Sequence, residues 1–277
     1  MRRWQVGEVT IVRIDSVELT LPSDRPLPDW AVPHLVPAVD TTAIAFSAFG
    51  VVDGDRRIVV DPWLADDSPR SAPDAAARID GLLDELAAAG LPAADVDLVV
   101  NTHLDGIGWN TRPAPGGWTP TFPNARYLYP QAELVAVERG EPLLGGPELR
   151  PLLDAGVVDP VDLASGDEPL VLSPHVALHA APGHNFGHVA VHVDGGSGDG
   201  NLAVIPGHLF LDLFSVDDPS ALPGDGVEAP ATRRYILELL ARRSGLLLSP
   251  FFGGAGAGRV AGDPYEGFRL TPVSDSP

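Results

Sequence analysis

The sequence predicts an α/β protein in which two mixed β-sheets pack face to face and helices cover their outer surfaces. Three observations lead to this prediction. Short strand-like segments dominate the chain, the first of them form a hairpin-rich half, and a helix separates that half from a second half with a similar order. Because a sheet and an amphipathic helix each bury one face, this order favours a layered αββα sandwich.

The first half opens with strands. Residues 9–14 alternate apolar and polar side chains, which is typical of a half-buried strand. Residues 43–49 and 57–61 are rich in strand-forming residues and flank the turn-forming triplet Asp-Gly-Asp at 53–55, so they predict a hairpin. Between these strands, residues 21–37 are rich in proline and are expected to form a lid or arm.

A helix and a buried strand follow. Residues 73–89 place apolar side chains at helical spacing, and Pro73 suits the first turn of a helix. Residues 96–100 are nearly all apolar and run directly into His103. In α/β proteins ligands bind at the carboxyl ends of such strands, so His103 is expected to lie at a functional site.

The remaining elements repeat the same two patterns. Further strands are predicted over residues 125–129, 170–172, 176–180, 189–193, 202–205 and 246–249, and helices over residues 131–139, 147–155 and 231–243. With 277 residues and no long linker, the chain is expected to form a single domain over residues 1–277.

Composition narrows the range of partners. A formal net charge of −20 disfavours nucleic acid and anionic membrane surfaces, because binding to both depends on clustered cations. With no cysteine, the chain has no disulfide and no thiolate ligand. No run of about 18 apolar residues and no secretory signal are present, so a cytoplasmic protein with a small-molecule substrate is expected, and a homodimer is left open.

Four stretches in order resemble the metallo-β-lactamase superfamily, in particular its lactonase-like hydrolases. Residues 102–111, T-H-L-D-G-I-G-W-N-T, stand where that family has T-H-x-H-x-D-H followed by a G-W-N-T-like run, and residues 121–127 continue the match. Residues 181–188, A-P-G-H-N-F-G-H, resemble the family's P-G-H-T-P-G-H, which makes His184 the counterpart of a metal ligand. The resemblance implies the metallo-β-lactamase fold over nearly the whole chain.

Departures from the family pattern concern the metal ligands. The first motif is two residues short, so that Asp105 stands either for its second histidine or for its aspartate. The family's T-G-D, whose aspartate bridges two metals, reads P-G-H and ends in His208. The family's T-H-F reads Ser-Pro-Phe at 249–251. Because a neutral imidazole supplies no anionic bridge and proline no ligand, the resemblance implies that the dinuclear zinc centre is lost.

The lead hypothesis is a metal-independent enzyme. His208, His103 and His184 would transfer protons and Asp105 would orient one of them, with no cofactor. Loss of ligands also implies loss of the outer shell that supports them. The substrate would be a small, fairly apolar carbonyl compound that undergoes cyclisation, isomerisation, elimination or hydrolysis of an ester, lactone or thioester.

Two alternatives stay open. In the first, at most one divalent ion is retained by His103, Asp105, His184 and His208, which would give a mononuclear hydrolase or oxygenase. In the second, the chain is a pseudoenzyme that binds a ligand or a partner without catalysis.

Aromatic side chains near these motifs belong either to the core, which is the commoner place for phenylalanine, or to an apolar binding site. The substrate-contacting candidates are Trp109, Trp30, Phe210, Phe214 and Phe251. Asp61 resembles the family's strand-end aspartate and is expected to have a structural role in its loop. His188 is expected to lie behind the ligands rather than among them, and His175, His179 and His192 are expected to be surface or hydrogen-bonded residues of strands.

Overall fold

The structure is a computed structural model that describes residues 2–20, 43–62, 75–104, 108–141, 149–185, 187–210, 225–252, 256–265 and 267–273. The arm predicted over residues 21–37 lies outside this part of the chain.

The first sheet has seven strands in the order β1-β2-β3-β4-β5-β8-β9. Their bounds are β1 Arg2–Val6, β2 Val9–Thr20, β3 Ala43–Asp53, β4 Arg56–Val60, β5 Leu98–Val100, β8 Arg126–Pro130 and β9 Val158–Val161. The strands from β1 to β4 pair antiparallel, whereas β4, β5, β8 and β9 pair parallel. The parallel part requires crossovers between its strands, and α1 (Ala75–Ala88) supplies the one between β4 and β5.

The second sheet also has seven strands, in sequence order from β10 to β16. Their bounds are β10 Leu170–Ser173, β11 Val176–Ala180, β12 Val189–Asp194, β13 Leu202–Ile205, β14 Leu246–Leu247, β15 Gly258–Asp263 and β16 Gly267–Pro272. All neighbours pair antiparallel except β13 and β14, which are parallel and joined through α4 (Ala229–Ala241).

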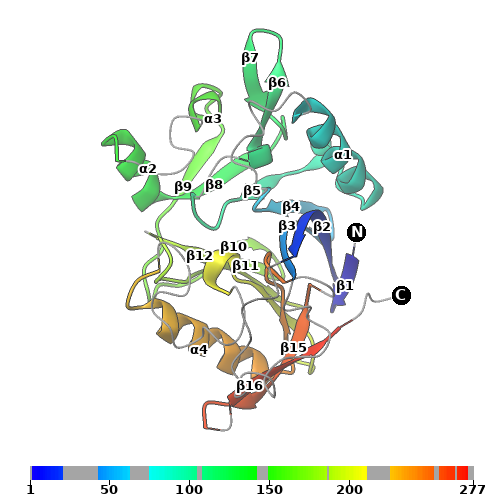
Figure 1. Cartoon of the computed structure of the whole chain (residues 1–277), viewed down its shortest axis with the longest axis vertical. Coiled ribbons are helices and arrows are strands. Elements are labelled where there is room, and N and C mark those ends of the chain that lie inside the picture. The colour runs from blue at the N-terminus through cyan, green and yellow to red at the C-terminus, as the bar shows by residue number, and fades with distance from the viewer. Residues whose placement is uncertain are drawn as a thin grey trace.

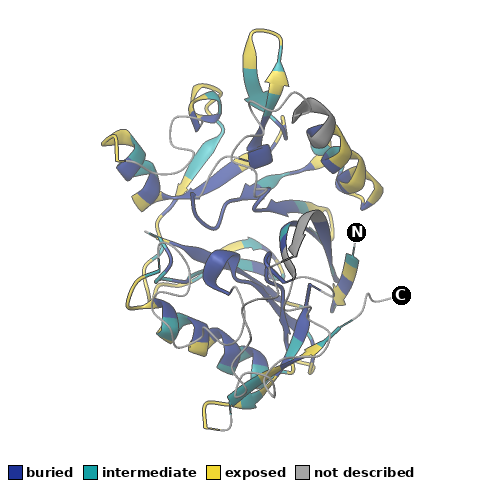
Figure 2. Ribbon diagram, in the orientation of Figure 1, coloured by how far each residue is buried: buried dark blue, intermediate teal, exposed yellow. Residues whose placement is uncertain are grey.

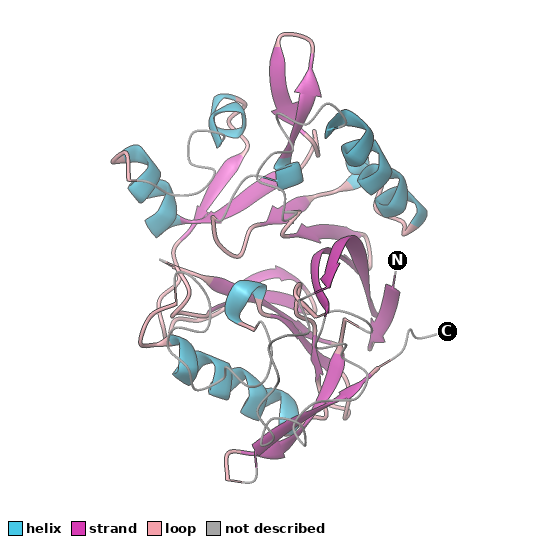
Figure 3. Ribbon diagram, viewed as in Figure 1, coloured by secondary structure: helices cyan, strands magenta, loops and turns pink. Residues whose placement is uncertain are grey.

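Helices lie outside the two sheets, as Figures 1 and 3 show. α1, α2 (Gln131–Glu138) and α3 (Arg150–Asp154) lie on the outer side of the first sheet, and α4 lies on the outer side of the second. A separate hairpin of β6 (Thr111–Ala114) and β7 (Gly117–Pro120) extends beyond the first sheet. Within the described residues, short 3-10 turns lie at Ala93–Asp95, Gly108–Asn110 and Gly207–Leu209. The predicted αββα sandwich is confirmed.

The core has three layers, which follow from the period of two along each strand. In β11, Leu178 faces the first sheet and packs in one apolar cluster with Ile11 and Val51, while Ala177 and His179 face outward. A second cluster joins the first sheet to α1, and a third joins the second sheet to α4. Figure 2 shows the buried strands between the more exposed helices.

Candidate metal centre

His103 lies in the loop that leaves the carboxyl end of β5. Thr102 fixes this loop, because its backbone N–H and its hydroxyl donate to the two carboxylate oxygens of Asp61, each at 2.8 Å. Burial raises the pKa of Asp61 to about 7. When Asp61 is ionised, the Thr102 hydroxyl donates its only hydrogen to that carboxylate. The hydroxyl oxygen then accepts a hydrogen bond from His103 Nδ1 at 3.0 Å. In that state of Asp61, His103 carries its lone pair on Nε2.

His184 is oriented in the same way by a different carboxylate. It lies in the turn between β11 and β12 and pairs with Asp225 in an isolated bridge. Its Nδ1 lies 2.9 Å from Asp225 Oδ1, and an ionised Asp225 can only accept, so Nδ1 carries the hydrogen. Its Nε2 is buried and has no hydrogen-bond partner in the described part of the chain. An unpaired buried ring nitrogen of this kind suits a metal ligand.

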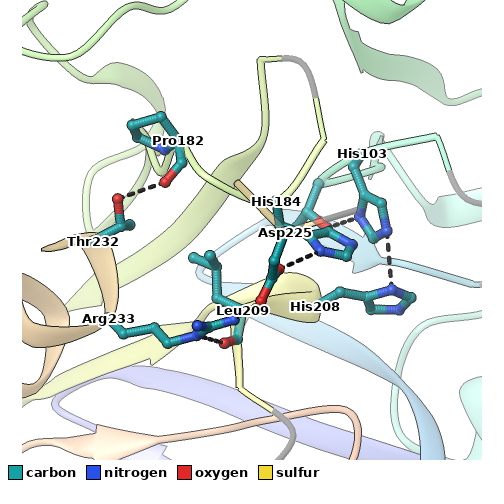
Figure 4. Close-up of polar contacts among 9 residues, drawn as sticks. His103, Pro182, His184, His208, Leu209, Asp225, Thr232 and Arg233 are labelled. Carbon is teal, nitrogen blue, oxygen red and sulfur yellow. Dashed lines mark hydrogen bonds and ion pairs between the residues drawn. The ribbon is translucent and has the colours of Figure 1, made fainter. Parts of the chain in front are cut away.

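His208 completes the group from the second sheet. It lies in the 3-10 turn that follows β13, is 4% exposed, and places Nδ1 3.0 Å from His103 Nε2. The ligand atoms of His103, His184 and His208 all lie within 4.8 Å of one another. Figure 4 shows the three rings converging from separate segments. Ligand nitrogens lie about 2.0–2.1 Å from a zinc ion, so one ion fits among them with small shifts.

The outer shell of this group is present, which makes the expectation of its loss wrong for the described residues. The side chain of Asp225 is fully buried and is itself paired with the guanidinium of Arg233 on α4. Asp61 holds Thr102, which contacts His103, so the structural role expected for Asp61 extends to this histidine. Carboxylate partners on the second ring nitrogen are the usual support of metal-binding histidines.

Sequence reasoning missed three of the residues that hold the site. Asp225 and Arg233 lie outside every motif that the sequence analysis used. Glu133, in the first turn of α2, is fully buried and accepts from the backbone N–H of Leu104, directly after His103. An acidic residue in the first turn of a predicted helix was the one available signal, and it is too common to identify a site.

His188 lies closer to the group than the sequence indicated. It is 1% exposed, its ring centre is 5.1 Å from that of His103 and 5.6 Å from that of His184. Within the described residues neither of its ring nitrogens has a hydrogen-bond partner of good geometry. Burial holds its pKa well below the usual value, and the neighbouring imidazoles add to this, so His188 is neutral.

The remaining sequence candidates fall in different environments. Phe251 contacts the site, because its ring centre lies 4.6 Å from that of His208. Trp109 packs in the cluster between the first sheet and its helices, and Phe210 packs under α4. Asp105, Trp30 and Phe214 lie outside the described residues. The structure thus brings together His103, His184, His208 and Phe251 of the predicted set.

Gly207 allows the loops to come this close. Its φ is 56°, and a Cβ there would lie 2.4 Å from Thr102 Oγ1 and 2.7 Å from His188 Nε2. Gly207→Ala should therefore lower the stability by more than the roughly 1–2 kcal/mol of a left-handed backbone and should displace Thr102. Gly54→Ala is the matched control, since Gly54 has φ 59° and a Cβ added there would meet no atom within 4 Å. Equal melting temperatures for the two variants would contradict this account.

The sequence matches no protein-family model and no curated protein. In the described residues no helix has both the length and the apolar character that a membrane crossing requires.

Solved structures, by contrast, match over the whole chain. AbOPH, a hydrolase in the beta-lactamase superfamily, aligns with a TM-score of 0.70 and 17% identity over 100% of this chain and 98% of its own. AidC, a dizinc quorum-quenching lactonase, aligns with a TM-score of 0.68 and 18% identity over the same shares. A probable metal-dependent hydrolase from Staphylococcus aureus aligns with a TM-score of 0.67 and 14% identity, over 98% of this chain and 99% of its own. The chain therefore has the metallo-β-lactamase fold.

Proposed function

We propose that this chain is a mononuclear, metal-dependent hydrolase whose ion is held by His103, His184 and His208. The observation that carries the proposal is the convergence of three buried imidazoles whose ligand atoms lie within 4.8 Å of one another. Two of them present Nε2 lone pairs that their outer-shell partners fix in advance. Three histidines with an open position form a recurrent type of catalytic zinc site.

The donor set supports one ion rather than two. Two dications at close range need an anionic bridge between them, and the residue at the corresponding position is His208. Among the described residues no second group of three ligand side chains comes together. Asp105, which the sequence offered as a further ligand, lies outside that part of the chain.

Each residue of the site has a defined task in this proposal. A divalent ion would polarise a substrate carbonyl and a water molecule. Asp225 and Thr102 keep His184 and His103 in the tautomer that binds metal. Phe251 lies against the ring of His208 at a tilt of 46° and would provide an apolar wall beside it. The wall favours a small, fairly apolar ester, lactone or thioester as the substrate.

A metal-independent acid–base enzyme is the second candidate, and the 3.0 Å separation of His103 Nε2 and His208 Nδ1 favours it. Without an ion, two such nitrogens share one hydrogen, which gives a pair of imidazoles able to accept and return a proton. The two candidates therefore differ in what lies between these two nitrogens.

Metal analysis separates the two candidates. We expect the purified, tag-free protein to contain close to one equivalent of zinc, iron or manganese by plasma mass spectrometry. A chelator should abolish hydrolysis of a panel of aryl esters, lactones and thioesters, and one specific ion should restore it. Hydrolysis that persists unchanged in a metal-free sample would exclude the metal-dependent mechanism and leave the acid–base mechanism.

A further inference from the structure

One buried guanidinium contacts two separate loops of the site. Arg233 lies on α4 and is 1% exposed. Its Nη2 donates to Asp225 Oδ2, and its Nε donates to the backbone carbonyl of Leu209. Figure 4 shows Arg233 reaching toward Asp225 and Leu209. The side chain thus bridges the segment that supports His184 and the turn that carries His208.

The two contacts control two different ligands. Asp225 receives the Nδ1 hydrogen of His184, so the contact with Arg233 keeps this carboxylate turned toward that ring. Leu209 directly follows His208 and ends the same 3-10 turn, so the bond to its carbonyl holds the turn in place. His103 depends on Thr102 and Asp61 instead and provides an internal comparison.

The start of α4 is fixed against the turn that precedes His184, which places Arg233 near both of its acceptors. Gly226 N–H donates to the Gly183 carbonyl at 2.6 Å, and Thr232 Oγ1 donates to the Pro182 carbonyl at 2.5 Å. A Cβ on Gly183 would lie 2.2 Å from Ala229 N, so the turn before His184 packs directly on the first residues of the helix.

We propose that Arg233 is a positioning residue that sets the direction of both His184 and His208, so that metal affinity is controlled from α4. This proposal rests on the proposed function only where the experiment measures metal affinity. Arginine suits the task because its planar, permanently charged group presents several N–H donors in a fixed arrangement. A lysine would offer one point charge and could not serve the carboxylate and the carbonyl with the same geometry.

The first experiment compares zinc affinity, measured by competition with a chromophoric chelator. Arg233→Met and Arg233→Lys should each lower the affinity by roughly 10–100-fold, the range found for outer-shell partners. Arg242→Gln is the matched control, because Arg242 lies at the end of the same helix, is exposed, and forms an ion pair with Glu238 on the helix surface. Variants of Arg233 that fold, by circular dichroism, and bind zinc within twofold of wild type would overturn the proposal.

The second experiment reads the histidine tautomer directly and needs neither metal nor folded Arg233 variants. Long-range ¹⁵N–¹H NMR of the metal-free wild type should show the His184 hydrogen on Nδ1. In Asp225→Asn, Arg233 would take the amide oxygen and leave the NH₂ facing His184, which should move the hydrogen to Nε2. The same tautomer in both proteins would overturn the proposal. If the tautomer differs between wild type and Asp225→Asn but the wild type binds neither zinc, iron nor manganese, the metal-dependent function is refuted and the positioning role stands.

Discussion

Replacing His184 with alanine should remove bound metal and reduce hydrolysis by more than the roughly 10–100-fold expected for an outer-shell partner. The side chain supplies one of three ligand atoms that lie within 4.8 Å of one another, and two ligands alone hold a divalent ion poorly. The variant also leaves the buried Asp225 without its histidine partner. The measurements are the metal content per chain and the initial rate of hydrolysis of the most reactive ester or lactone of the panel, each compared with wild type.

His179→Gln is the matched control for this variant. His179 lies on β11, a few residues before His184, but it faces the outer side of the second sheet and stacks on His192 with ring centres 3.9 Å apart. It should change the melting temperature and leave the metal content unaltered. If His184→Ala retained a full equivalent of metal, the three-histidine site would be refuted whatever the activity.

Local patterns predicted the elements that surround the site with small errors in their ends. The apolar run at 202–205 is β13 at the same bounds, and the alternating run at 176–180 is β11. The helix expected over 147–155 is shorter, at Arg150–Asp154. The segments at β6, β7 and β9 were missed, because proline and glycine occupy four-residue strands that carry no periodic signal. The longer strands β15 and β16 were missed as well, and glycines interrupt their pattern too.

Some residues of the site could likewise be predicted from the sequence and others could not. His103, His184 and His208 could be predicted because each follows a recognisable strand or motif. Asp225 and Arg233 could not, because their role arises when α4 docks on the turn before His184, which is a tertiary contact between distant segments. Whether Phe210 or Phe251 borders the site also depends on the direction in which each turn leaves its strand, and a sequence pattern does not specify that direction.

Acid should destabilise the protein steeply, and His192 should account for a large share of the effect. Its ring is 6% exposed on β12, and burial together with the stacked His179 lowers its pKa from 6.5 to about 3. Between pH 6.5 and about 3, His192 binds a proton in the unfolded chain but not in the folded chain. Stability is therefore lost as the pH falls toward 3, by about 1.4 kcal/mol per pH unit and about 5 kcal/mol in all for this group.

His192→Gln should remove about one proton from the pH dependence of the unfolding free energy in metal-free protein, as measured by urea denaturation between pH 7 and 4. His175→Gln is a control of opposite sign. Hydrogen bonding to Asp53 raises the pKa of the more exposed His175, so this histidine stabilises the fold at low pH and its removal should increase acid sensitivity. Equal slopes for wild type and His192→Gln would show that His192 gains its proton without unfolding, by rotating into solvent from the outer face of the sheet.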